Sequence, residues 1–411
     1  MELLILGLQD KLENPESHSA DHLDWVQHEL DIISNAGLKR FRKALKFCPD
    51  GSIVYRKKKL VNFASSDYLA FSKHPAVNHS VRKALHSYGV GAGASPLVSG
   101  YTQIHRALER EIAQWEGFDD ALVFSSGFGV NLGTISALVH PKDLILSDAL
   151  NHASIIDGCR LSRATLRFFK HKDCDHLQDL ILRAKRNFRK LWIITDTLFS
   201  MDGDHAPIEK LFQIALKNDA MLILDEAHAT GVTGVDARGL TDTFPVGLDW
   251  KSRVIKLGTL SKALASQGGF VCANKKIITL IKNKARSYIF STALSPVCVA
   301  AARTVLKLII KDNSRMAYVN SLSAYLRSKL VEMGLDIGQS ESHIIPVIFG
   351  DAEKTMRISK SLLEQGYLVP PIRPPSVPEN SSRLRISITA FHSHELVNDF
   401  LLKLKLVLSQ N

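Results

Sequence analysis

The 411-residue sequence lacks the features that mark a membrane, disulfide-bonded or metal-binding protein. No apolar run reaches the roughly 18 residues that span a bilayer. The opening run Leu3–Leu8 is short and has neither the basic flank nor the cleavage site of a signal peptide. The five cysteines are scattered without a CxxC pair, which is typical of reduced core thiols. We therefore expect a soluble, cytoplasmic protein without a metal site.

Acidic residues are in the minority, with 41 Asp and Glu against 52 Lys and Arg and a net charge of +11. Such an excess suits a nucleic acid, a membrane surface, polyanionic small molecules or acidic carrier proteins, and composition does not choose between them. The basic residues run through helical stretches such as residues 183–190, which is typical of a solvated face. We expect neither a nucleic-acid nor a membrane partner.

The length predicts two or three structural units, and the composition (45% hydrophobic, 23% charged) is that of an ordinary folded protein. The first fifty residues are expected to be helical, since apolar side chains recur at Leu23, Val26, Leu30 and Ile33. A short strand pair is expected around Ser52–Phe63, with the basic run 56–59 in a solvated turn. These segments form an N-terminal helical arm over residues 1–60.

From about residue 80, short apolar runs alternate with stretches of helical period. Runs that are apolar on both faces are typical of strands in a mostly parallel sheet covered by helices. This pattern predicts a large α/β domain over residues 61–294. The runs are Ala121–Phe124, Asp143–Leu146, Leu191–Ile194, Met221–Leu224, Arg253–Lys256 and Phe270–Cys272.

The pattern changes again after about residue 295. Two long helices are expected at Val297–Asp312 and Ala317–Met333, and strands at Ile344–Ile348 and Leu384–Ile388 with a helix between them. This arrangement predicts a smaller α+β domain over residues 295–411.

Polar or glycine residues follow nearly every apolar run of the large domain. In open α/β sheets, ligands bind at the carboxyl ends of the strands, so these residues are expected to share one rim. Lys262 follows the run at 253–256 among small and hydroxylated residues. Partial burial there would lower its pKa and suit it to Schiff-base and general-base chemistry. The alternative is an ordinary lysine in a surface loop.

Asp225 and His228 end the strand Met221–Leu224. A carboxylate at a buried strand end can keep a pyridine nitrogen protonated, which turns the ring into an electron sink. His228 could reach the phenolic oxygen of the same ring. The alternative is an acidic strand end that caps a helix.

Three further turns place polar groups on the same rim. Gly127 and Phe128 follow the strand at 121–124 and open a helix, where backbone amides can approach a phosphate. His152 follows the run at 143–146 and could stack on an aromatic cofactor, and Ser200 offers a hydroxyl after the run at 191–194. Tight packing and ordinary surface positions remain the alternatives for each.

Taken together, these motifs resemble the α-oxoamine synthase family of fold-type I enzymes, from about Gly37 to the last helix. The resemblance implies an α/β fold-type I pyridoxal-phosphate-dependent transferase with a mostly parallel central sheet covered by helices and a smaller α+β C-terminal domain. It implies pyridoxal 5'-phosphate as cofactor. Its catalytic residues would be Lys262, His152 and Asp225, and the cofactor would also contact Gly127, Phe128, Ser200, His228 and Thr259.

The block Ile372–Pro378, followed by Arg383–Ser387, resembles the branch of this family that joins L-alanine to a pimeloyl thioester in biotin biosynthesis. The thioester would be carried by coenzyme A or by an acyl carrier protein. In this resemblance Arg373 holds the amino-acid carboxylate, Ser376 stands where threonine is common, and Arg40 contacts the acyl substrate. Ser66 replaces the asparagine of the family's NFxSNDYLG segment, which bears on amino-acid selectivity.

The segment Phe290–Thr292 resembles one that reaches the cofactor phosphate of a neighbouring subunit, so Ser291 and Thr292 imply a homodimer. Two alternatives keep the lysine chemistry: a synthase that joins glycine to acetyl-CoA, and one that joins serine to a long acyl chain. An aminotransferase is disfavoured because no arginine occurs from Ala263 to Asn274.

Overall fold

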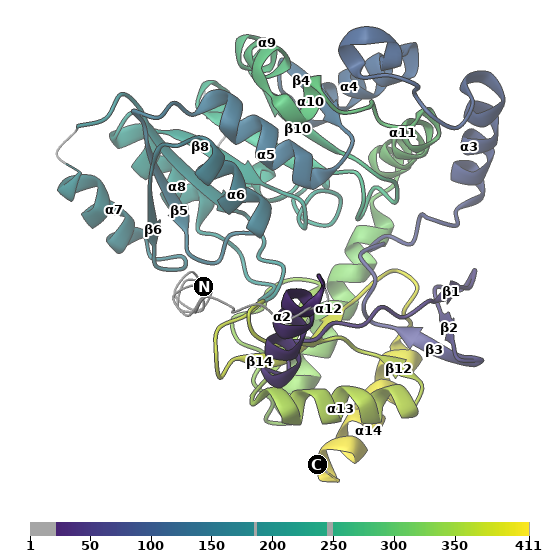
Figure 1. Cartoon of the computed structure of the whole chain (residues 1–411). Helices are drawn as coiled ribbons and strands as arrows, with labels where there is room; N and C mark the ends of the chain where they lie inside the picture. Colours follow the sequence, from purple (N-terminus) through teal and green to yellow (C-terminus); the bar gives the residue numbers. More distant parts are fainter. Residues whose placement is uncertain (1–21, 185–186, 245–249, 411) are drawn as a thin grey trace.

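The computed structural model describes residues 22–184, 187–244 and 250–410, and it contains a large α/β unit above a smaller unit (Figure 1). A seven-stranded sheet with the order β4-β10-β9-β8-β7-β5-β6 forms the centre of the large unit. β10 runs antiparallel to β4 and β9, and the remaining neighbours that pair are parallel. The mostly parallel sheet predicted from the apolar runs is confirmed.

Each of the six predicted runs forms a strand of this sheet, whereas β6 was not expected. β6 lies at the sheet edge and is mostly exposed, so it lacks the continuous apolar run that marks a buried strand. The strands are β4 (Asp120–Phe124), β5 (Leu144–Asp148), β6 (Thr165–Phe169), β7 (Leu191–Asp196), β8 (Met221–Asp225), β9 (Val254–Thr259) and β10 (Gly269–Ala273).

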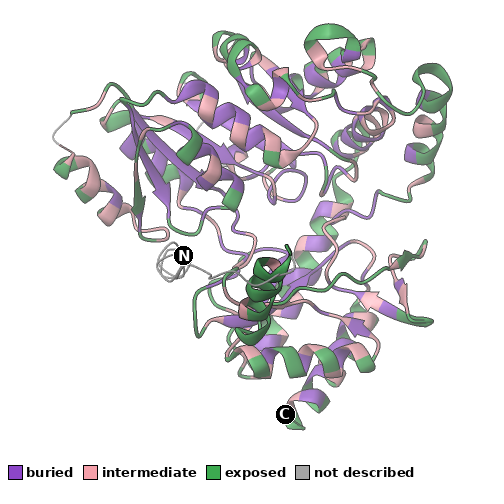
Figure 2. Cartoon of the chain, viewed as in Figure 1, coloured by how far each residue is buried: buried purple, intermediate pink, exposed green. Residues whose placement is uncertain are grey.

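Helices cover both faces of the sheet, because alternate residues of a strand point to opposite sides. Leu122 packs in one core cluster with side chains of α5 (Gly127–Leu138), α6 (Ala153–Leu161) and α9 (Lys275–Lys284). Its neighbour Val123 packs in the other. The helices of that second face are α4 (Gln103–Glu116), α7 (Cys174–Arg183), α8 (Ile208–Lys217) and α11 (Pro296–Lys311). Figure 2 shows the strands buried between these layers.

The smaller unit contains the antiparallel sheet β11-β14-β13 and three helices. The predicted helices and both predicted strands after residue 295 are confirmed within a few residues. The elements are α12 (Ser314–Glu332), β11 (Ile344–Gly350), α13 (Ala352–Glu364), β13 (Pro371–Ile372), β14 (Ser382–Ser387) and α14 (His394–Ser409).

The N-terminal segment is joined to the smaller unit by a second sheet. β1 (Lys46–Phe47), β2 (Ile53–Tyr55) and β3 (Lys58–Asn62) form an antiparallel ribbon, and β12 (Tyr367–Leu368) adds parallel to β3. The strand pair predicted at 52–63 is confirmed. The predicted basic turn is shorter than expected, because Lys58 and Lys59 already belong to β3.

The helical prediction for the first fifty residues is correct for α2 (Asp24–Asn35) and wrong for residues 36–50, which contain no helix and include β1. Leu3–Leu8 lies outside the described residues. α2 carries the predicted apolar stripe, yet none of its residues is buried. α3 (Pro75–Tyr88) and α10 (Arg286–Ile289) complete the α-helices of the described ranges. None of the helices described is long and apolar enough to cross a membrane.

Candidate active site

A cavity of about 300 Å³ lies at the carboxyl ends of the parallel strands. Loops that follow β4, β5, β7, β8 and β9 bring polar side chains into it, as the ends of parallel strands share one edge. Eight residues singled out in the sequence line this one cavity: Gly127, Phe128, His152, Ser200, Asp225, His228, Thr259 and Lys262.

The side chain of Lys262 reaches the cavity from the loop after β9 and is half-buried. Burial disfavours the ammonium form and lowers the lysine pKa to about 8, although the carboxylates of Asp225 and Asp196 oppose this effect. A lysine with a pKa near 8 is a nucleophile and a proton acceptor close to neutral pH. The local chemistry is therefore that expected of a Schiff-base lysine.

Asp225 ends β8 and is 5% exposed. Its two carboxylate oxygens accept hydrogen bonds from the side-chain amide of Asn131 (2.7 Å) and from the backbone amide of Ala227 (2.8 Å). Asn131, on α5, also donates to the hydroxyl of Ser154 at 2.9 Å. These bonds fix the orientation of a buried anion at the cavity wall, which is what a protonated ring nitrogen requires of its partner.

His228 is almost fully buried, and its Nδ1 lies 2.7 Å from the hydroxyl of Tyr68. Burial, together with the positive charges of Lys262 and Arg385, lowers the pKa of His228 well below its usual value. The imidazole is therefore neutral at pH 7, with one ring nitrogen held by Tyr68 and the other free to meet a ligand.

His152 stands at the N-terminus of α6, and its backbone amide donates to the carboxylate of Asp196 at 2.7 Å. Its ring lies edge-on to Phe128, with 6.5 Å between the centroids. Burial lowers the pKa of His152. Burial and the neighbouring Asp225 raise the pKa of Asp196 well above its usual range.

The N-terminus of α5 opens into the cavity at Gly127. The hydroxyl of Ser126 accepts from the backbone amide of Gly129 at 2.9 Å, which caps the helix. A Cβ at Gly127 would lie 3.0 Å from the hydroxyl of Thr259, so the glycine permits this close approach. Free amides and the dipole of a 12-residue helix favour an anion at this end.

Arg385 was not assigned a role from the sequence, although it is buried beside this cavity. It extends from β14 of the smaller unit, and its Nε donates to the carbonyl of Ser200 at 2.5 Å. Its charge contributes to the lowered pKa values of His228 and Lys262. A signal in the sequence could have found it: Arg383 and Arg385 alternate with Leu384 and Ile386 in one strand, which places both arginines on one face.

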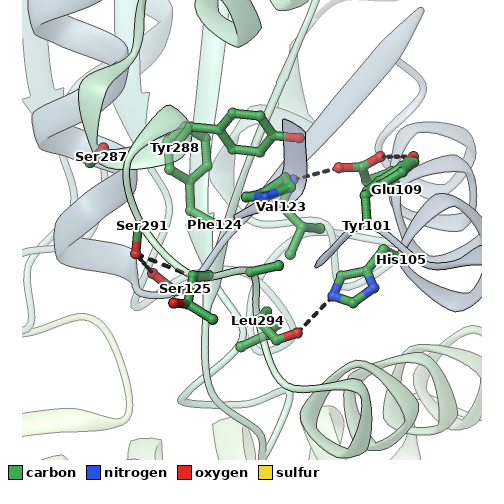
Figure 3. Close-up of a pocket in the computed structure, with 13 residues that line it drawn as sticks. Tyr101, His105, Glu109, Val123, Phe124, Ser125, Ser287, Tyr288, Ser291 and Leu294 are labelled. Carbon is green, nitrogen blue, oxygen red and sulfur yellow. Dashed lines mark hydrogen bonds between the residues drawn. The ribbon is translucent and has the colours of Figure 1, made fainter. Parts of the chain in front are cut away.

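Ser291 and Thr292 line a second, smaller hollow of about 10 Å³ (Figure 3). The hydroxyl of Ser291 lies 3.2 Å from that of Ser125, and the next residue, Ser126, lines the large cavity. Behind them, Glu109 is held by the hydroxyl of Tyr101 and the backbone amide of Val123. Ser291 thus contacts the residue that precedes the N-cap of α5, and both predicted residues lie outside the main cavity.

Arg40, Arg373 and Ser376 do not line either described cavity of this chain. The guanidinium of Arg373 donates to the carbonyl of Lys39 at 3.1 Å, and the backbone amide of Ser376 donates to the carbonyl of Arg373. Their roles toward substrate stay predictions.

Comparison with known proteins identifies the relatives of this chain. The family model for class I and II aminotransferases matches residues 58–404. The 8-amino-7-oxononanoate synthase of Anaeromyxobacter dehalogenans is 39% identical over 387 residues, or 94% of this chain and 96% of that protein. The chain is also similar to a structure of serine palmitoyltransferase from S. paucimobilis with bound PLP–myriocin (28% identity, TM-score 0.87, 95% and 99% coverage).

A solved 8-amino-7-oxononanoate synthase from Francisella tularensis is similar to 85% of this chain, with 98% of its own length covered, 28% identity and a TM-score of 0.73. The fold-type prediction and the cofactor prediction agree with these relatives. The chain belongs to the class I and II aminotransferase family and, within it, to the 8-amino-7-oxononanoate synthases.

Proposed function

We propose that this protein condenses L-alanine with a pimeloyl thioester, with loss of carbon dioxide, to give 8-amino-7-oxononanoate in biotin biosynthesis. The observation that carries the proposal is the convergence of Lys262, Asp225, His228 and His152 on one cavity, in a chain whose relatives are 8-amino-7-oxononanoate synthases. We further infer that it works in the cytoplasm as a homodimer, with neither a nucleic acid nor a membrane as partner.

The residues of the cavity fit pyridoxal 5'-phosphate. The α5 N-terminus at Gly127 and the hydroxyls of Ser126 and Thr259 suit its phosphate. The carboxylate of Asp225 suits the pyridine nitrogen, and the amine of Lys262 suits the aldehyde. A cavity of about 300 Å³ is at the lower end of the range for small-molecule sites. We propose that Ser291 and Thr292 reach the phosphate bound by a second copy of the chain.

When bound, pyridoxal phosphate supplies an electron sink for charge that develops at the amino-acid Cα. Asp225 would hold the proton on the ring nitrogen, and Asn131 holds Asp225 in place. Lys262, freed by the incoming amino acid, would accept the proton from the alanine Cα. His152 would cover the ring face and polarise the thioester carbonyl.

The overall bond changes are then defined. A bond forms between the alanine Cα and the acyl carbon, the C–S bond of the thioester breaks, and the thiol leaves with a proton. The carboxylate of alanine departs as carbon dioxide, and Lys262 would return a proton to the alanine Cα. Arg385 is the buried cation best placed to hold the alanine carboxylate, and Arg373 is the second candidate.

A substrate panel tests this proposal. Purified protein with pyridoxal phosphate would be given alanine, glycine or serine, each with acetyl, pimeloyl or palmitoyl thioester, and products would be identified by mass spectrometry. We expect activity with alanine and the pimeloyl thioester, and its loss in Lys262→Ala together with the visible absorbance of the lysine-bound cofactor. Turnover confined to glycine with acetyl-CoA, or to serine with the palmitoyl thioester as in serine palmitoyltransferase, would contradict it.

A further inference from the structure

The positive charge of this protein is concentrated in one short segment. Residues 39–59 contain nine lysine or arginine residues and a single carboxylate, Asp50, a balance of +8 out of the net +11. The rest of the chain is nearly neutral. The prediction that basic residues run through helical stretches such as residues 183–190 does not describe this segment, which contains no helix. We call these residues the basic surface: Lys39, Arg40, Arg42, Lys43, Lys46, Arg56, Lys57, Lys58 and Lys59.

All nine residues of the basic surface are exposed. They lie on the strand-free stretch that follows α2 and on the ribbon β1–β2–β3, which projects from the smaller unit in Figure 1 and is coloured largely as exposed or intermediate in Figure 2. Within the described residues, Lys59 is the one member with a carboxylate within 4.0 Å, its ammonium lying 2.6 Å from Asp50. Eight cations thus face solvent without an acidic partner in the described part of the chain.

Like charges gathered in one exposed segment repel one another, so the stability of the fold does not explain the cluster. It does produce a strong local positive potential, which attracts anionic partners and speeds their association. A second copy of this chain would be repelled if the same surface faced itself across a two-fold axis. The partner that this surface fits is therefore acidic and is a different molecule.

The basic surface is continuous with the loop that leads to the cavity. The carbonyl of Lys39 accepts from Arg373, and a Cβ at Gly37 would lie 3.9 Å from the Arg373 guanidinium. Arg373 follows β13, which pairs with β14, and β14 carries Arg385, which bonds to the carbonyl of the cavity residue Ser200. A partner docked on the basic surface would thus sit beside the segment that connects to the acyl-transfer site.

We propose that the basic surface docks an acidic acyl carrier protein that presents the pimeloyl thioester to the cavity. This inference rests on the proposed function, since only a thioester substrate gives the docked partner something to deliver. Two exposed aromatic rings, those of Phe41 (80% exposed) and Phe47 (62%), lie among the cations. Aromatic residues beside arginine are the composition of protein interfaces, in which charge guides the approach and apolar contact holds the complex.

The test compares two variants that lose the same charge. One removes four cations of the basic surface (Lys43→Gln, Lys46→Gln, Lys57→Asn and Lys58→Gln), and the control removes four exposed lysines elsewhere (Lys217→Gln, Lys276→Gln, Lys360→Gln and Lys405→Gln). Neither set includes Arg40, Arg373 or a residue of the cavity. Steady-state kinetics would be measured with pimeloyl-acyl carrier protein and with pimeloyl-CoA, and binding of the holo-carrier protein by calorimetry.

We expect the basic-surface variant to raise KM for the carrier-linked substrate by about tenfold or more, with kcat/KM for the CoA thioester within about twofold of wild type. Carrier binding should weaken in parallel and fall with added salt in the wild type. The control variant should behave as wild type. An unchanged KM for the carrier-linked substrate, or an equal loss in the control, would overturn the proposal.

Two further outcomes separate this proposal from the proposed function. Wild-type activity with pimeloyl-CoA but no saturable binding of the carrier protein would remove the docking proposal alone. Inactivity with both thioesters would remove the proposed function. Binding would also be tested at 0.15 M salt with two other probes, vesicles that contain one-third phosphatidylserine and, separately, a single-stranded RNA. Binding of either probe in place of the carrier protein would also overturn the docking proposal.

Discussion

At the scale of single residues, two arginines of the smaller unit are candidates for the same anion but differ in environment. Arg385 is 8% exposed and fixed between the Ser200 carbonyl and the Ser387 hydroxyl. Arg373 meets a backbone carbonyl of the exposed N-terminal strip. A buried, oriented guanidinium loses little conformational freedom when it binds a carboxylate, so Arg385 is the better-prepared site.

We predict that Arg385→Lys raises KM for alanine by tenfold or more, since a charge-assisted bidentate contact is lost. Arg373→Lys should change that KM by less than threefold in the same assay. Steady-state kinetics at saturating acyl thioester provides the measurement. A larger effect in Arg373→Lys than in Arg385→Lys would assign the carboxylate to Arg373 instead.

His171 shows how a single titratable side chain couples pH to stability. Its ring nitrogens lie 3.0 Å from a carboxylate oxygen of Asp148 and 3.0 Å from one of Asp204, and its ring packs edge-on against Phe199. Burial opposes the charged form, but the two carboxylates outweigh burial and raise the His171 pKa to about 9. The stabilisation that protonated His171 gives the folded state is therefore complete below about pH 6.5 and is lost as the pH rises through about 9.

We predict that His171→Gln lowers the free energy of unfolding by about 2 kcal/mol at pH 6.5, allowing for partial solvent screening. The difference from wild type should shrink to a few tenths of a kcal/mol at pH 10. Guanidinium denaturation at both pH values measures it, and the exposed His86→Gln serves as control. A difference that does not depend on pH would show that His171 is not charged in the native state.

At the scale of secondary structure elements, strand β9 contains a lysine that is fully buried. The ammonium of Lys256 bonds to the Glu116 carboxylate of α4 (2.5 Å), to the Thr241 hydroxyl (3.1 Å) and to the Arg238 carbonyl. Burial disfavours its charge, but Glu116 and Glu226 outweigh burial and raise its pKa. This ion pair ties α4 to the sheet on the face opposite α5.

We predict that Lys256→Met destabilises the protein by about 3 kcal/mol, because it leaves the Glu116 carboxylate buried without a cation. Lys256→Met combined with Glu116→Leu should regain at least half of that loss, since no uncompensated charge remains. Urea denaturation of both variants, with exposed Lys276→Met as control, gives the comparison. A double variant less stable than the single one would contradict this account.

The chemistry at the strand ends could be predicted from the sequence because it follows from local pattern. Asp225 ends a run buried on both faces, Lys262 lies three residues beyond the end of another, and the geometry of parallel strands then brings them together. The residues that hold the cavity side chains could not be predicted, because their contacts join distant parts of the chain. Asn131 bonds to Asp225, Tyr68 to His228, and Arg385 to Ser200.

Two elements show the limit of periodicity more directly. β6 was not predicted because it lies at the sheet edge, where only one of its residues is buried and no apolar run is needed. α2 was predicted from its apolar stripe, yet none of its residues is buried in the described part of the chain. Periodicity establishes that a face is apolar but does not identify what covers it.

At the scale of the whole molecule, the loop 199–204 joins the two units at the cavity. From the smaller unit, Arg383 bonds to the Asp202 carboxylate and Arg385 to the Ser200 carbonyl, while the backbone amide of Glu341 donates to the Gly203 carbonyl at 3.0 Å. The large unit holds the other end of the loop through Asp204, which accepts from Lys172. The position of Ser200 in the cavity therefore depends on how closely the two units pack.

Gly203 allows this packing for two reasons. Its φ of 69° lies in the left-handed region, and a Cβ at this position would overlap the carbonyl oxygen of Ile344 in β11. Gly334 provides a matched control, because its φ is 74° but no atom lies within 4 Å of where its Cβ would stand. An alanine at either position meets the same backbone strain, and only at Gly203 does it also collide with the other unit.

We predict that Gly203→Ala lowers the free energy of unfolding by about 3 kcal/mol, against about 1 kcal/mol for Gly334→Ala. Gly203→Ala should also raise KM for alanine, because displacement of the loop moves the Ser200 carbonyl that positions Arg385. Gly334→Ala should leave that KM unchanged. Urea denaturation and alanine titrations on both variants separate the two effects. Equal destabilisation by the two substitutions, with normal KM in both, would mean that the units adjust without moving the loop and that the cavity does not depend on their close packing.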